Sequence, residues 1–168
     1  MTYLIIDTNV PLKAANLQPE DDIDRACSLS CFRFIKAIMN SDDVVVLDDN
    51  QEILREYRNK INIDLQDNVA TEFLMWLYHK IRDNTVEMHR ITKTDNNTYV
   101  EFPDSPDLTG FDQSDRKFVA LSKAHPAHPN IYNGSDTDWW AYKDALEAQG
   151  VHVVFLCEEY MRAKYKGS

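Results

Sequence analysis

The fold is decided by the stretch YLIIDTNV, which covers residues 3–10. Its aliphatic residues Leu4, Ile5 and Ile6 form an uninterrupted apolar run. Such a run is typical of a strand that is buried on both faces at the centre of a sheet, because a strand with one solvated face alternates instead. Asp7 follows at the point where this strand would leave the core. Its carboxylate therefore belongs either to a turn or to an acidic site.

The rest of the chain alternates short apolar runs with longer segments of helical periodicity. Strands are predicted at residues 44–47, 130–133 and 151–156, and helices at 23–39, 51–61, 65–82, 112–124, 136–149 and the end of the chain. Asp48 and Asp49 are suitable N-caps for the helix at 51–61. Residues 85–111 mix alternating strands with turn residues, which predicts a hairpin and then a loop. This order indicates an α/β fold with a parallel sheet between helices.

Length and composition predict one soluble domain. The 168 residues are enough to bury a core, and a hydrophobic share of 43% argues against disorder. The net charge of -10 argues against a broad basic surface for nucleic acid, but it allows a local phosphate site built on metal ions. We see no signal peptide and no run of about 20 apolar residues, so we expect a cytoplasmic protein without a membrane partner.

The chain has three cysteines, Cys27, Cys31 and Cys157, which is an odd number without the spacing of a zinc site. Cys27 and Cys31 lie four residues apart on the apolar face of a predicted helix. We therefore expect buried thiols in a reducing cytosol.

Acidic residues gather at the ends of the predicted strands or one helical turn beyond them. They form four groups: Asp7; Glu52 with Glu56; Asp112 with Asp115; and Asp136 with Asp138. Each group alone has an ordinary explanation, since aspartates cap helices and helix glutamates pair with nearby lysines and arginines. In a parallel sheet, however, the carboxyl ends of the strands share one edge.

Four acidic groups at one edge would repel one another. Two carboxylates about 4 Å apart repel by about 4 kcal/mol at an effective dielectric constant of about 20. Hard divalent cations remove this cost, and Mg2+ and Mn2+ prefer carboxylate oxygens as ligands. The acids therefore predict a Mg2+ or Mn2+ site.

Four motifs follow one another along the chain: LIIDTNV, EILREYRNKI, FDQSDRKFVALS and NGSDTDWW. In this order they resemble the motifs of the PIN domain family, the metal-dependent nucleases of many bacterial toxins and RNA-processing factors. By this resemblance the catalytic, metal-binding positions of the family fall on Asp7, Glu56, Asp115 and Asp136. The implied fold is a PIN-like three-layer α/β/α sandwich with a mostly parallel sheet, in one domain over residues 1–168. Residues 62–111 form an insertion that we do not match to the family.

The resemblance implies a Mg2+- or Mn2+-dependent endoribonuclease that hydrolyses single-stranded RNA, with single-stranded DNA as a second target. It also implies a toxin or defence role and an antitoxin or other protein partner. A homodimer is suggested instead by the apolar face around Phe73, Trp76 and Leu77. Five further residues would support the site: Asn9, Glu52, Asp112, Ser135 and Asp138. The choice of Glu56 over Glu52 stays open by one helical turn. Gly134 and Ser135 stand where the family often has Thr-Gly.

Two other functions are compatible with the sequence. A HAD-like phosphatase also has an aspartate after its first strand, but it normally has a second acid two residues later, where this chain has Asn9. A non-catalytic PIN-like scaffold would bind RNA or a protein without cutting RNA. The apolar face around Phe73, Trp76 and Leu77 suits either such a partner or core packing.

Aromatic and histidine side chains near the motifs also have two explanations each. Tyr132, Trp139 and Trp140 either stack on a base or pack in the core. His125 and His128 have the spacing of a metal-binding pair, but the neighbouring prolines favour a plain turn.

Overall fold

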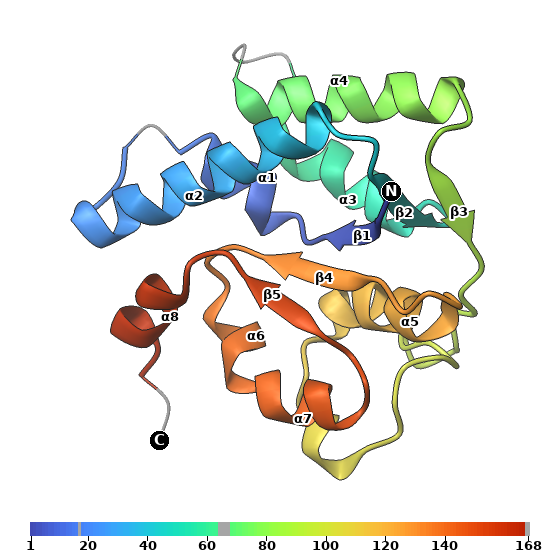
Figure 1. The fold of residues 1–168 in the computed structure, drawn as a ribbon. Coiled ribbons are helices and arrows are strands. Elements are labelled where there is room, and N and C mark those ends of the chain that lie inside the picture. The colour runs from blue at the N-terminus through green and yellow to red at the C-terminus, as the bar shows by residue number, and fades with distance from the viewer. Residues whose placement is uncertain (17, 64–67, 167–168) are drawn as a thin grey trace.

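The centre of the fold is a five-stranded parallel sheet between two layers of helices (Figure 1). The computed structural model describes residues 1–16, 18–63 and 68–166. The strand order is β3-β2-β1-β4-β5, and every neighbouring pair is parallel. The strands are β1 (Tyr3–Ile6), β2 (Val44–Asp48), β3 (Glu87–His89), β4 (Asn130–Asn133) and β5 (Val153–Phe155). The predicted α/β/α sandwich is therefore confirmed.

Helices cover both faces of the sheet. Figure 1 shows α1 to α4 on one face and α5 to α7 on the other. On the first face the bounds are α1 (Asn9–Ala14), α2 (Asp22–Met39), α3 (Glu52–Lys60) and α4 (Val69–Arg82). The later helices are η1 (Pro106–Leu108), η2 (Gln113–Asp115), α5 (Arg116–Ala124), α6 (Thr137–Ala141), α7 (Lys143–Ala148) and α8 (Glu158–Lys164), where η marks a 3-10 helix.

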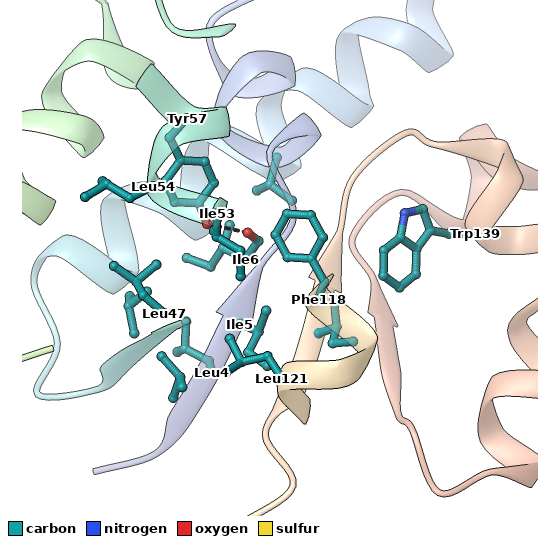
Figure 2. Close-up of a cluster of buried hydrophobic side chains, with 14 of the residues drawn as sticks. Leu4, Ile5, Ile6, Leu47, Ile53, Leu54, Tyr57, Phe118, Leu121 and Trp139 are labelled. Carbon is teal, nitrogen blue, oxygen red and sulfur yellow. Dashed lines mark hydrogen bonds between the residues drawn. The ribbon is translucent and has the colours of Figure 1, made fainter. Parts of the chain in front are cut away.

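The predicted buried strand is β1, at the middle of the sheet. Leu4, Ile5 and Ile6 are at most 2% exposed. Side chains of α3 and α5 pack onto β1 from opposite faces, as Figure 2 shows for Tyr57 and Phe118. The Tyr57 hydroxyl also donates a hydrogen bond to the carbonyl oxygen of Ile6. The strand is apolar throughout because both of its faces are covered.

The strand order reverses at β1. The chain adds β2 and β3 on one side of β1, and later adds β4 and β5 on the other side. The loops that follow β1 and β4 therefore lead to opposite faces of the sheet. Such a reversal is where open parallel sheets bind their ligands. Asp7 directly follows β1, and Asn133 is the last residue of β4.

Two helices differ from the prediction. The sequence does not predict α1, which contains Pro11 in its first turn, where a missing N–H group breaks no helical hydrogen bond. The single helix predicted at 136–149 is two helices, α6 and α7, which meet at Tyr142. The Tyr142 ring packs edge-on against Phe111, and its N–H group donates to the carbonyl oxygen of Trp139. Tertiary packing thus interrupts a continuous helical pattern.

The segment after α4 is also only partly as predicted. The hairpin is confirmed in a small form, with one antiparallel bridge between Lys93 and Tyr99. The preceding strand β3 is instead a parallel edge strand beside β2. The sequence does not indicate this pairing because β3 has only three residues and its partner lies far away in the chain.

Helix starts agree with most of the predicted caps. Asp48 accepts hydrogen bonds of 2.9 Å from the N–H groups of Glu52 and Ile53 at the start of α3. Asp49 accepts one from Ile91 instead. Helix α4 begins at Val69, and the first three residues of the helix predicted at 65–82 lie outside the described residues.

The cysteine prediction is wrong, because two of the thiols are paired. Cys27 of α2 and Cys157, directly before α8, form a disulfide bond, and their Cα atoms lie 5.1 Å apart. Cys31 is a buried free thiol whose Sγ lies 3.7 Å from that of Cys157. The sequence hides the pairing because 130 residues separate the two partners. Disulfides are typical of oxidising compartments, so the cytoplasmic location stays a prediction.

Within residues 1–16, 18–63 and 68–166, no helix combines the length and the apolar character that crossing a bilayer requires.

Removing the disulfide should destabilise the protein. The bond closes a long loop and so restricts the unfolded chain, which contributes roughly 3–5 kcal/mol to the free energy of unfolding. We expect Cys157→Ser to lose this amount in urea titrations without reductant. Cys31→Ala is the matched control, because it removes a buried thiol and leaves the bond intact. Equal losses in the two variants would contradict the pairing of Cys27 with Cys157.

Candidate functional site

The candidate site lies at the carboxyl ends of β1 and β4, beside the reversal in strand order. Asp7 is only 3% exposed there, and its N–H group donates to the carbonyl oxygen of Tyr132 in β4. The buried strand therefore fixes the backbone of Asp7 on the neighbouring strand. A carboxylate at this depth needs partners, because burial disfavours its charge.

Two amide side chains hold the Asp7 carboxylate. Asn133 Nδ2 donates to Asp7 Oδ2 over 2.9 Å, and Asn9 Nδ2 donates to the same oxygen. Asp7 Oδ1 receives no side-chain hydrogen bond from the described residues. Asn9 is among the supporting residues that the sequence predicts, whereas Asn133 is not. Asn133 shares the sequence feature that singles out Asp7, since each is a polar residue directly at the end of a buried strand.

Asn9 also holds the loop after β4. Its Oδ1 accepts hydrogen bonds from the N–H groups of Gly134, over 2.7 Å, and Ser135, over 3.3 Å. A Cβ atom at Gly134 would lie 2.8 Å from Asn9 Oδ1 and 3.1 Å from the Sγ of Cys31, so only glycine fits this approach. Ser135, which the sequence predicts as a supporting residue, contributes through its backbone N–H group.

Two further aspartates reach the site from the helical layer. Asp115 ends η2 directly before α5 and is 9% exposed. Asp136 is the N-cap of α6, and it accepts a hydrogen bond of 3.0 Å from the N–H group of Asp138. Asp136 thus has the capping role that the sequence allows, in addition to its place in the acidic cluster.

The pKa values of these acids show which neighbouring charges act on each of them. Burial raises the pKa of Asp7 well above its ordinary value, and the charges of Asp115, Asp136 and Glu56 raise it further. Burial, followed by the charges of Asp136, Asp112 and Glu56, raises the pKa of Asp115 to about 7. Burial also raises the pKa of Asp136, against the N–H group of Asp138. The structure thus brings together the four acids that the motifs single out.

Glu56 differs from the three aspartates, because it has cationic partners. Lys117 Nζ lies 2.5 Å from one carboxylate oxygen and Lys60 Nζ lies 2.8 Å from the other. Burial raises the pKa of Glu56, but the hydrogen bonds from Lys117 and Lys60 outweigh it and leave this pKa lowered. The sequence predicts that Lys60 and Lys117 either flank the site or balance acids of their helices, but it does not reveal the pairing of Lys117 with Glu56, because the two residues lie on different helices.

The three aspartates make no direct ion pair of this kind. No lysine, arginine or histidine of the described residues makes a salt bridge with Asp7, Asp115 or Asp136. The charges of Lys117 and Lys60 lower the pKa values of Asp115 and Asp136, but burial outweighs them. Two polar atoms near Asp7, Thr8 Oγ1 and Asn133 Oδ1, are buried without a hydrogen-bond partner. Carboxylates without a direct ion pair, beside unsatisfied oxygens, fit a divalent cation.

The carboxylates do not form the tightest group of ligand atoms in the protein. Among the described residues, sets of three or more whose ligand atoms all lie within 4.8 Å are Cys27, Cys31 and Cys157, and Glu87, His89 and His125. Within the ranges that the structure describes, no three carboxylates of the acidic cluster form a set this compact. A bound cation would therefore draw them closer together or bind some of them through water.

The remaining candidates lie around the cluster. Glu52 pairs with Arg55 at 3.3 Å and with Lys93 at 3.5 Å, and its charge is not among those that shift the pKa of Asp7. This geometry favours Glu56 over Glu52. Asp112 caps η2 through hydrogen bonds from Ser114, and its charge acts on Asp115.

Two of the three aromatic candidates pack against other aromatic rings. Trp139 is fully buried and packs edge-on against Phe111. Tyr132 stacks on Phe34 with ring centroids 4.6 Å apart. Trp140 is partly buried against Phe155. The core explanation therefore holds for Trp139.

The histidines make separate hydrogen bonds. His125 Nε2 lies 2.8 Å from Glu87 Oε1, while His125 Nδ1 accepts from the N–H group of Ala127. Because Nδ1 is an acceptor, the proton of the neutral ring sits on Nε2, which donates it to Glu87. His128 instead contacts the carbonyl oxygen of Ser122. The turn explanation of the two histidines is the one that agrees with the structure.

Comparison with known proteins gives no family assignment. No protein-family model matches the chain, and neither a curated protein nor a solved structure matches it. The resemblance to PIN domains thus stays a prediction from the four sequence motifs.

Neutralising Asp115 should stabilise the metal-free protein at neutral pH. Its native pKa of about 7 exceeds the ordinary value of 3.8, so between these values the native state keeps a proton that the unfolded chain loses. Stability in EDTA therefore falls as the pH rises through this window. We expect Asp115→Asn to match wild type near pH 4 and to be more stable by about 1–3 kcal/mol near pH 8.

The control for this measurement is Asp144→Asn, an exposed carboxylate of α7. Thermal unfolding of the three proteins across the pH range separates the outcomes. A constant difference between Asp115→Asn and wild type at every pH would show that Asp115 does not titrate in the acidic cluster.

Proposed function

We propose that the protein is a Mg2+- or Mn2+-dependent nuclease that hydrolyses phosphodiester bonds in single-stranded RNA. The observation that carries this proposal is the cluster of Asp7, Asp115 and Asp136, three carboxylates whose pKa values are raised by burial and by neighbouring acids and that make no salt bridge within the described residues. RNA as the substrate follows from the resemblance to PIN domains, and the cluster itself supports metal-assisted hydrolysis.

The three aspartates would hold the cation, and Glu56 would act beside them. A bound divalent ion lowers the pKa of a water molecule and neutralises charge on the phosphate group. Asp7 offers Oδ1 to this ion, because Asn9 and Asn133 engage Oδ2. These amides orient the carboxylate in the way that outer hydrogen bonds orient metal ligands.

The net negative charge of the chain would repel RNA, but the two lysines beside Glu56 offset this repulsion locally. Lys60 and Lys117 place two positive charges directly at the acidic cluster, although the net charge is -10. Together with a cation, they would make the local potential more favourable for a phosphate group than the net charge suggests. A toxin or defence role and an antitoxin belong to this proposal through the resemblance alone. The homodimer rests on the apolar face of α4, of which Phe73 and Leu77 are buried in the core.

The two rival functions have less support. Both polar atoms of the Asn9 side chain are engaged, so it supplies no acid–base group for a HAD-like phosphatase. The face proposed for a partner of a non-catalytic scaffold contains Phe73 and Leu77, which are fully buried in the core. Neither alternative is favoured by an observation of its own.

Asp7→Asn should abolish cleavage without unfolding the protein. The substitution keeps the shape of the side chain and removes a charge that a cation needs, so we expect a loss of about 100-fold or more in cleavage of single-stranded RNA. The assay compares RNA and DNA strands in Mn2+, Mg2+ and EDTA.

Glu52→Gln is the matched control, because Glu52 lies one helical turn from Glu56 and outside the acidic cluster. We expect it to cleave as wild type does. Cleavage that persists in EDTA, or an Asp7→Asn protein as active as wild type, would refute the metal-dependent nuclease. Intact binding of RNA without any cleavage by wild type would favour the scaffold.

A further inference from the structure

An open pocket lies beside the acidic cluster, between the start of α3, the hairpin at residues 92–100 and the start of η2. Its volume is about 440 Å3, which is in the range of small-molecule sites. Side chains of all three segments line it, among them Lys93, Asn97, Tyr99, Gln113 and Lys117. The hairpin belongs to the insertion that has no counterpart in the motifs.

Three consecutive residues connect this pocket to the candidate site. Asp115 is part of the acidic cluster, and Lys117 both lines the pocket and pairs with Glu56. Arg116, between them, donates hydrogen bonds to Thr98 Oγ1 over 3.1 Å and to the carbonyl oxygen of Thr109 over 2.9 Å. The pocket is therefore held in a fixed position relative to the acids.

Arg116 is itself well fixed. It also donates to the carbonyl oxygen of Phe111, and its guanidinium group lies 4.5 Å from the centre of the Phe102 ring. The planar guanidinium group suits such simultaneous hydrogen bonding and stacking. A pocket wall that is already ordered loses little conformational freedom when a ligand binds.

The charged acids of the pocket already have partners, whereas its amides do not. Glu52 pairs with Arg55 and Lys93, and Asp112 accepts two hydrogen bonds from Ser114. The side chains of Asn97 and Gln113 are exposed, and in the described part of the chain no side-chain hydrogen bond is recorded for either. Each amide offers two donors and one acceptor.

Free amides suit the edge of a nucleobase better than a phosphate group. Bases display donors and acceptors side by side, and amide side chains match such pairs. A base can enter such a pocket only when it is unstacked, as in a single strand. Phosphate recognition would instead call for free cations, and the lysines of this pocket are already paired with Glu52 and Glu56.

We propose that this pocket binds the base of the nucleotide next to the scissile phosphate and gives the protein a base preference. This inference rests on the proposed function for the position of the phosphate. Asn97 and Gln113 supply the hydrogen bonds to the base, and Arg116 positions the hairpin that carries Asn97.

The test measures binding of the four ribonucleoside 5'-monophosphates in Mn2+ by calorimetry. None of them contains a cleavable diester, so binding is measured apart from catalysis. We expect wild type to bind one base about tenfold more tightly than the weakest, the effect of about one hydrogen bond. The double variant Asn97→Gly/Gln113→Ala should bind all four equally. Glycine is used at position 97 because its φ is +55°.

Asn96→Gly is the matched control, since it changes the neighbouring amide of the same turn, which does not line the pocket. It should keep the preference. Equal binding of all four nucleotides by wild type, binding of none of them, or a preference that survives in the double variant would overturn the proposal. Hydrolysis of bis(p-nitrophenyl) phosphate, a diester without a base, is measured in parallel. Its absence in wild type would count against the nuclease and not against the base pocket.

Discussion

The burial of the Asp7 carboxylate is the constraint on which the rest of the site depends. Asp7 lies buried at the end of the apolar central strand, and a buried carboxylate without hydrogen bonds would be strongly disfavoured. Asn9 and Asn133 satisfy one of its oxygens, and they come from the next helix and the neighbouring strand. Because Asn9 also fixes the loop before Asp136, one buried charge organises the carboxyl ends of both β1 and β4.

Sequence patterns predict the parts of this structure that depend on local order. The apolar runs of β1 and β2 and the periodicity of α2 and α3 each reflect burial of one segment, and all four elements are present. The third strand, the division at Tyr142 and the disulfide depend on partners far away in the chain, so no local pattern reveals them. Two residues of the site differ in the same way. Asp7 is recognisable because it follows a predicted strand, whereas the ion pair of Lys117 with Glu56 depends on how two helices pack together.

Glu56 and the three aspartates differ in how their negative charge is compensated. Glu56 is neutralised by lysines within the protein, so its lowered pKa needs no ligand. The pKa values of the three aspartates stay raised, first because the carboxylates are buried and then because neighbouring acids repel their charge. A site with this division can bind a cation through the aspartates while it keeps lysine charge near an anionic substrate.

The run Asp115–Arg116–Lys117 links the acidic cluster to the loop segments around the pocket. Arg116 reaches the hairpin through Thr98 Oγ1, and it also donates to the carbonyl oxygens of Thr109 and Phe111, which lie outside the hairpin. Backbone carbonyls are present whatever the side chains at these positions, so the two contacts do not depend on the sequence of the hairpin. Changes within the hairpin can therefore leave Arg116, and with it the neighbouring aspartate, in place.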